Sequence, residues 1–87
     1  MFVILAYDVG SKRVSKARKI IKKYLNPLQE SVFEGHISEA KLGKLKKELF
    51  EFIDNDYDSV IIYKIGSTRF AKKDEIGKTL NYEPWIL

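Results

Sequence analysis

The sequence predicts an α+β fold in which two helices cover one face of an antiparallel sheet. Two short runs rich in β-branched and apolar residues, FVILAYD at residues 2–8 and SVIIYKI at residues 59–65, are typical of buried strands. Two segments between these runs carry apolar residues at helical spacing. The chain has 87 residues, which is enough for one domain with one hydrophobic core.

The first half of the chain is predicted to form a strand followed by a helix. After the strand at residues 2–8, Gly10 and Ser11 provide a turn and a helix N-cap. Pro27 is expected to end the helix, because proline disfavours helical geometry at the residue before it and has no N–H. The residues predicted to form the apolar stripe of this helix are Val14, Ala17, Ile21, Tyr24 and Leu25.

The second half is predicted to continue with two strands, a helix and a strand. The segment LQESVFEGHIS indicates two short strands around a tight turn near Glu34–Gly35, and Ser38 is a candidate N-cap for the second helix. The apolar stripe of that helix is Leu42, Leu45, Leu49, Phe52 and Ile53. The resulting order, β-α-β-β-α-β in one domain of residues 1–87, predicts a ferredoxin-like sandwich with an antiparallel sheet.

The tail NYEPWIL is too apolar for a solvated terminus. Pro84 favours an extended or sheet-edge conformation. We expect the tail to add a C-terminal strand at the edge beside residues 59–65, since open edges are usually covered. It can do so on its own subunit or on a second copy.

The net charge is +4, and the charged residues are distributed unevenly along the chain. Residues 9–29 contain seven basic residues and no acidic one, while the rest of the chain is slightly acidic. A basic helix without compensating acids at i,i+4 favours binding to a polyanion such as nucleic acid, although exposed lysines are often simply solvated. Four of these residues are close in sequence to Asp8 and are the first candidates for phosphate contacts: Lys12, Arg13, Lys16 and Lys19.

Asp8 stands where the first apolar strand meets a loop, just before the basic helix. It is either a structural carboxylate that accepts hydrogen bonds from the following turn, or a ligand for a hard cation such as Mg²⁺. One or two carboxylates suffice for Mg²⁺ when a phosphate supplies further oxygens. Two copies of Asp8 in a twofold dimer provide a better site than one.

Other classes of site are disfavoured. The chain has no cysteine, so disulfides and thiolate metal sites are excluded. His36 is interpreted as structural rather than as a ligand, and DNDYD at residues 54–58 as a solvated loop rather than a calcium loop. The run FVILAY is too short to span a bilayer and has no signal-peptide features, so we expect no membrane association and a cytoplasmic location.

The residues YDV that end the first strand, the basic helix, and the element LQESVFEG resemble the small CRISPR-associated adaptation protein, the Cas-two family. The resemblance covers residues 2 to about 65. Its most specific part is Q-x-S-V-F-E, in which Gln29, Ser31 and Phe33 match the family motif, as Tyr7 does in the first strand.

The resemblance implies a ferredoxin-like homodimer that exchanges its tail, about residues 80–87, across the dimer. It also implies a Mg²⁺-dependent endonuclease acting on single-stranded RNA or duplex DNA, with Asp8 as the catalytic, metal-binding residue and one ion shared by two copies of Asp8. A further partner is the Cas-one integrase of the spacer-acquisition complex. Where the family often has an arginine, this chain has Pro27. The alternative is a non-catalytic DNA-binding assembly subunit that bridges the integrase.

Overall fold

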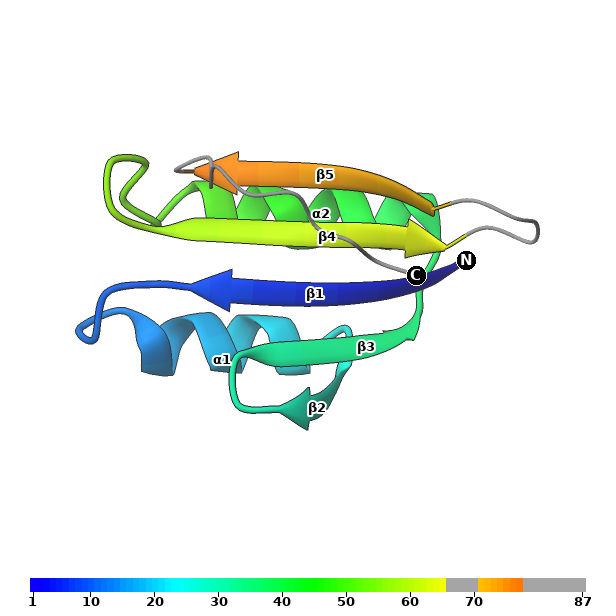
Figure 1. Ribbon diagram of the computed structural model, residues 1–87, viewed down its shortest axis with the longest axis horizontal. Coiled ribbons are helices and arrows are strands. Elements are labelled where there is room, and N and C mark those ends of the chain that lie inside the picture. The colour runs from blue at the N-terminus through cyan, green and yellow to red at the C-terminus, as the bar shows by residue number, and fades with distance from the viewer. Residues whose placement is uncertain (66–70, 78–87) are drawn as a thin grey trace.

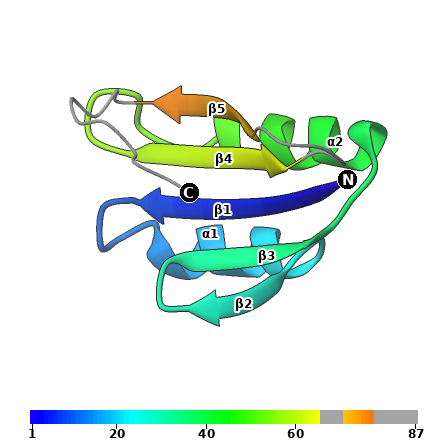
Figure 2. The ribbon, with the colours of Figure 1, turned by 45° about the vertical axis from the view of Figure 1, so that its right-hand side comes forward.

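The computed structural model describes residues 1–65 and 71–77. The elements follow the order β1 (Phe2–Asp8), α1 (Val14–Lys22), β2 (Asn26–Gln29), β3 (Val32–His36), α2 (Glu39–Phe50), β4 (Ser59–Ile65) and β5 (Ala71–Gly77). Both helices lie on the same face of the sheet, with α1 behind β1 and β3 and α2 behind β4 and β5 (Figures 1 and 2).

The sheet in the described part of the chain has the strand order β2-β3-β1-β4-β5, and every neighbouring pair is antiparallel. The order of its first four strands is that of a ferredoxin-like fold, so the predicted fold class is confirmed. The predicted strands at residues 2–8 and 59–65 have the predicted bounds. They are neighbours in the sheet, with Phe2 opposite Ile65 and Asp8 opposite Ser59.

The hydrophobic core lies between the helices and the inner face of the sheet. Side chains alternate along a strand, so Leu5 of β1 and Ile62 of β4, which are paired, both point inward and are fully buried. Phe33 of β3 is also fully buried. The helical side chains that complete the core include Ala17, Ile20, Ile21, Leu42, Leu45 and Leu49.

The helix ends differ in part from the sequence prediction. Ser38 caps α2 as expected, because its hydroxyl accepts a hydrogen bond from the Lys41 N–H at 3.2 Å. Ser11 does not cap α1; the N-cap is Arg13, which makes no side-chain capping bond. The prediction that Pro27 ends α1 is also wrong, because the helix stops at Lys22 and Pro27 lies within the edge strand β2, where a missing N–H is tolerated.

The turn between β2 and β3 lies at Glu30–Ser31, so the predicted turn at Glu34–Gly35 is wrong. Ser31 adopts a φ of 70°, a left-handed conformation that serine seldom takes. Its carbonyl accepts a hydrogen bond from the Tyr7 N–H at 3.0 Å, which ties the turn to β1. Gly35 is inside β3, opposite Val3.

The edge beside β4 is not open. Strand β5 of the same chain pairs with β4 along its whole length, from Ser59 opposite Gly77 to Ile65 opposite Ala71. The prediction that the tail pairs with this edge is therefore wrong, because both sides of β4 are occupied, by β1 and β5. The tail itself, about residues 80–87, lies outside the described residues.

Candidate active site and nucleic-acid interface

Asp8 is the last residue of β1 and is exposed. Tyr7 is buried under the helices, so alternation along the strand turns Asp8 to the opposite face of the sheet, which we call the outer face. Within the described part of the chain, its carboxylate takes part in no hydrogen bond or ion pair. An exposed carboxylate without a protein partner is available to a cation or to another molecule.

The outer face beside Asp8 is apolar. Strand register and alternation place apolar side chains along the centre of this face, namely Phe2, Ile4, Ala6, Val32, Ile61, Tyr63 and Ile65. Glu34, His36 and Glu75 flank them on the neighbouring strands. Ile61 is only 6% exposed and Ile4 is half-buried. The centre of the outer face is therefore apolar and partly covered in the single chain, and charged or polar side chains border it.

The described residues contain no group of three or more His, Asp or Glu side chains arranged to hold a metal ion. Mg²⁺ binds through one or two carboxylates, with water and phosphate oxygens completing its octahedral shell. Asp8 fits as one such carboxylate.

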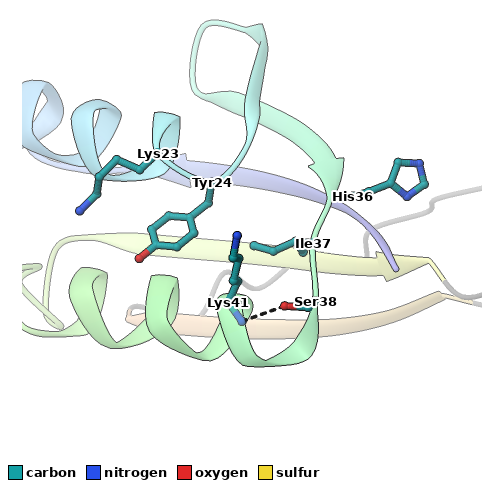
Figure 3. Close-up of a pocket in the computed structure, with 6 residues that line it drawn as sticks. All are labelled: Lys23, Tyr24, His36, Ile37, Ser38 and Lys41. Carbon is teal, nitrogen blue, oxygen red and sulfur yellow. Dashed lines mark hydrogen bonds between the residues drawn. The ribbon is translucent and has the colours of Figure 1, made fainter.

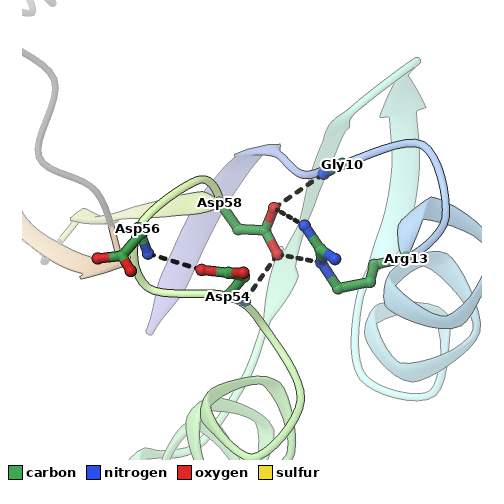
Figure 4. A network of polar contacts seen from close by, with 5 residues as sticks. All are labelled: Gly10, Arg13, Asp54, Asp56 and Asp58. Atoms are coloured by element: carbon green, nitrogen blue, oxygen red, sulfur yellow. Dashed lines mark hydrogen bonds and ion pairs between the residues drawn. The ribbon is translucent and has the colours of Figure 1, made fainter.

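A polar network lies directly beside Asp8 in the fold and joins the β1–α1 turn to the α2–β4 loop (Figure 4). Asp58 is fully buried and accepts four hydrogen bonds. The Gly10 N–H donates at 2.8 Å, Arg13 donates through Nε at 2.5 Å and Nη2 at 2.9 Å, and the Asp54 N–H donates at 2.8 Å. The interpretation of residues 54–58 as a solvated loop is therefore wrong for Asp58.

The hydrogen bond and ion pair with Arg13 lower the pKa of Asp58 to about 2, against the opposing effect of burial. The two backbone N–H donors act in the same direction as Arg13. The same hydrogen bond raises the pKa of the Arg13 guanidinium. Asp58 is thus charged at neutral pH, and its burial is compensated by a paired cation and a full set of donors.

Four basic residues of the α1 region contact other side chains of the protein. Arg13 is paired with Asp58, and Lys23 donates to Glu48 of α2 at 2.6 Å. Lys16 lies over the ring of Phe52 at 5.1 Å. Arg18 lies over the ring of Phe33 at 5.4 Å.

Three exposed lysines of this region make neither an ion pair nor a ring contact with any residue that the structure describes: Lys12, Lys19 and Lys22, which we call the outer cations. Of the four residues predicted to contact phosphate, Lys12 and Lys19 are in this group. Lys16 is exposed as well. The Arg13 side chain is 29% exposed and its Nε and Nη2 already donate to Asp58, so it is poorly placed for that role.

The motif residues come together around the end of the first strand. The ring of Tyr7 stacks on the fully buried ring of Phe33, with centroids 6.2 Å apart. The carbonyl of Ser31 accepts the Tyr7 N–H, and Gln29 is exposed on β2. Tyr7, Ser31 and Phe33 therefore hold the backbone just before Asp8 and do not form a surface site.

A cavity of about 300 Å³ lies where α1 ends and α2 begins (Figure 3). Lys41 reaches between Tyr24 and Ile37 there. His36 borders it but packs edge-on against Phe2, at 5.1 Å between centroids, in agreement with a structural role. Phe2 and Asp8 are opposite ends of β1, about 20 Å apart at the rise of a strand, so this cavity is separate from the Asp8 site.

Sequence reasoning missed Asp58 and its role beside Asp8. The D-x-D-x-D pattern resembles a polar loop, and the Arg13 partner lies 45 residues away in the sequence. The available signal was that Asp58 directly precedes the apolar run 59–65, since a carboxylate next to a buried strand requires donors. Neither helix in the described residues is long and apolar enough to cross a bilayer.

Comparison with known proteins identifies the family of this chain. The profile of the family described as CRISPR associated protein Cas2 matches residues 1–73. The protein of Dictyoglomus turgidum named CRISPR-associated endoribonuclease Cas2 is 39% identical over 87 residues, which cover 100% of both chains. The protein of Thermodesulfovibrio yellowstonii named CRISPR-associated endoribonuclease Cas2 3 is 45% identical over 76 residues, 87% of this chain and 86% of the other.

A solved structure is similar as well. The crystal structure of Streptococcus pyogenes Cas2 aligns with a TM-score of 0.70 and 32% identity, covering 76% of this chain and 87% of that one. The resemblance noted from YDV and Q-x-S-V-F-E is thereby confirmed, and the chain belongs to the CRISPR-associated protein Cas2 family.

Proposed function

We propose that this protein is a metal-dependent endonuclease that cleaves phosphodiester bonds in RNA or DNA, in the cytoplasm, as part of CRISPR antiviral defence. The observation that carries this proposal is Asp8, an exposed carboxylate without a protein partner in the described chain, at the end of a central strand. The name endoribonuclease borne by the relatives supports it.

The active form in this proposal is a homodimer. Two copies that bury the apolar outer face against each other bring two Asp8 side chains to the border of one interface. Burial of side chains such as Ile4 and Tyr63 provides the driving force, because transfer of apolar surface from water contributes about 25 cal/mol per Å².

The two Asp8 carboxylates would hold Mg²⁺ in this dimer. When bound, Mg²⁺ lowers the pKa of a coordinated water and stabilises the departing oxygen of the phosphodiester. The chain itself provides the negative charge of Asp8, the apolar surroundings of the outer face, and positive charge along α1. The outer cations bind backbone phosphates and so hold the strand without reading its sequence.

A second candidate function is a non-catalytic DNA-binding subunit that assembles with the Cas-one integrase. One observation favours it: Pro27, exposed on β2, stands where the family often has an arginine, so a phosphate contact is missing there. In this alternative Asp8 has no catalytic role, and the outer cations have the same role as in the nuclease.

Cleavage by an Asp8→Asn variant distinguishes the two functions. Purified protein is incubated with labelled single-stranded RNA and with duplex DNA, in Mg²⁺ and in EDTA. We expect Asp8→Asn to lose cleavage, because asparagine lacks the negative charge that binds the metal ion. The variant should keep the wild-type fold, because the side chains of asparagine and aspartate have nearly the same shape. Asp56→Asn is the matched control, since Asp56 is an exposed carboxylate of the α2–β4 loop. This variant should cleave as the wild type does. Equal cleavage by Asp8→Asn and wild type would rule out the nuclease mechanism and favour the assembly function.

A further inference from the structure

We propose that Arg13 and Asp58 form a positioning pair for Asp8: the partly buried ion pair joins the turn that follows Asp8 to the loop that precedes Ser59, its partner in the sheet, and thereby sets the direction of the Asp8 carboxylate. This inference rests on the proposed function of Asp8. Arg13 and Asp58 act through the backbone, and neither is proposed to contact the substrate.

Asp58 lies directly before the end of the β1–β4 ladder. The pairing of β1 with β4 ends at Asp8, which lies opposite Ser59. The last pair of a strand ladder is prone to fraying. Asp58 directly precedes Ser59, and its Oδ1 accepts the Gly10 N–H, two residues beyond Asp8, at 2.8 Å. The carboxylate thus continues the connection between the two chain segments past the last ladder pair.

Four hydrogen-bond donors constrain the Asp58 carboxylate. Oδ2 of Asp58 accepts from Arg13 Nε and from the Asp54 N–H, and Oδ1 accepts from Arg13 Nη2 and from the Gly10 N–H. A guanidinium that binds both oxygens defines the plane of the carboxylate, which a lysine ammonium does not. Figure 4 shows Arg13 and Asp58 facing each other between the two loops.

The Asp58 backbone is also held in place by the end of β5. A side chain on Gly77 would place its Cβ 2.2 Å from the Asp58 carbonyl oxygen, so the end of β5 packs directly on the Asp58 backbone. The side chain and the main chain of Asp58 are therefore fixed by different segments. A carboxylate that shares a metal ion across an interface needs this kind of support, because misplacement by about 1 Å can lower a rate about a hundredfold.

The chain provides a matched control at the other end of α1. Lys23, at the C-terminal end of α1, forms an ion pair of 2.6 Å with Glu48 of α2. Tyr24 donates a hydrogen bond to the same carboxylate. This pair lies near the cavity at the far end of β1 and not near Asp8. Loss of either pair weakens the attachment of α1, but only the Arg13–Asp58 pair adjoins Asp8.

The experiment compares full-length wild type with Arg13→Lys, Gly10→Ala and Glu48→Gln. Arg13→Lys keeps the charge and removes the two-oxygen contact. Gly10→Ala keeps both charges, but its Cβ would lie 2.6 Å from Arg13 Nη2 and displaces the guanidinium. Two readouts are recorded: steady-state cleavage with Mg²⁺, and the NMR signal of the ¹³C-labelled Asp8 carboxyl carbon in metal-free protein, assigned with Asp8→Asn.

For Arg13→Lys or Gly10→Ala, whichever folds, we expect kcat to fall about tenfold or more with a KM changed by less than about twofold, since the outer cations are intact. The Asp8 carboxyl signal should broaden or shift. Glu48→Gln should leave both readouts at their wild-type values.

Three results would overturn the inference: an unchanged Asp8 signal with an unchanged kcat, an effect of Glu48→Gln as large as that of Arg13→Lys, or a rise in KM alone. If wild-type protein does not cleave, the proposed nuclease function fails and the Asp8 carboxyl signal alone decides. A signal altered in Arg13→Lys but not in Glu48→Gln then supports the positioning pair, and an unaltered one refutes it.

Discussion

Asp58 makes the stability of this protein depend on pH in a defined range. Its pKa is lowered from the ordinary value of 3.8 to about 2 in the folded chain, chiefly by Arg13. A carboxyl group with a lowered folded-state pKa stabilises the fold above its unfolded-state pKa, and this contribution is lost as the pH falls towards the folded-state value. Each pKa unit corresponds to about 1.36 kcal/mol, so Asp58 contributes about 2.4 kcal/mol at pH 7, and this contribution is lost progressively between about pH 5 and pH 1.

The measurement is urea unfolding of wild type and Asp58→Asn, followed by circular dichroism at equal protein concentration from pH 7 to pH 2. Asp58→Asn lacks the titrating group, so the difference in free energy of unfolding should be constant from pH 7 to about pH 5 and then shrink by about 2 kcal/mol by pH 2. Glu48, whose pKa is also lowered by Lys23 and Tyr24, is present in both proteins and cancels. Asp56→Asn should follow the wild-type curve at every pH. A difference between wild type and Asp58→Asn that is as large at pH 2 as at pH 7 would show that the reasoning is wrong.

Three further predictions address binding, backbone conformation and assembly. Replacing the outer cations together by alanine should make the log–log salt slope of nucleic-acid binding shallower by up to about 2.7, whereas Arg13→Lys should leave the slope unchanged; an unaltered slope in the triple variant would place binding elsewhere. Gly77→Ala should lower the free energy of unfolding by about 2 kcal/mol in urea titrations, because Gly77 has a φ of 92° and no room for a Cβ, while Gly43→Ala, in open space on α2, should not destabilise. Ile4→Lys, on the outer face, should shift the protein to monomer in sedimentation velocity, and a folded variant that stays dimeric would exclude this face as the interface.

The parts of the fold that were predicted correctly rest on local patterns. FVILAYD is a short apolar run that ends on a charged residue, and β1 accordingly has the predicted bounds. Ser38 was identified as a cap because its hydroxyl precedes a helical stripe, and the cap depends on a residue only three positions away. Signals of this kind are contained in the sequence that forms the element.

The parts that were missed depend on contacts between distant residues or on unusual conformations. In the β2–β3 turn, Ser31 adopts a positive φ, a conformation that glycine usually provides. The sequence prediction therefore placed the turn at the nearby Gly35, which lies inside β3. Strand β5, AKKDEIG, has the polar composition of a loop, and pairing with β4 decides its conformation. At the candidate site, Asp8 was recognised from its position, but the role of Asp58 depends on Arg13, which no local pattern reveals.

The acid-free basic segment shows why charge must be considered in three dimensions. Among the residues that the structure describes, its two helix-capping residues are the two that pair with carboxylates: Arg13, at the N-terminus of α1, pairs with Asp58, and Lys23, at the C-terminus, pairs with Glu48. The missing acids are therefore supplied by the later half of the chain, and they are placed at both ends of the helix. A helix attached at both ends presents its remaining lysines from a fixed backbone, so less conformational freedom is lost when phosphates bind. It follows that breaking either pair should weaken nucleic-acid binding less than removing the outer cations, and that only the pair beside Asp8 should also affect cleavage.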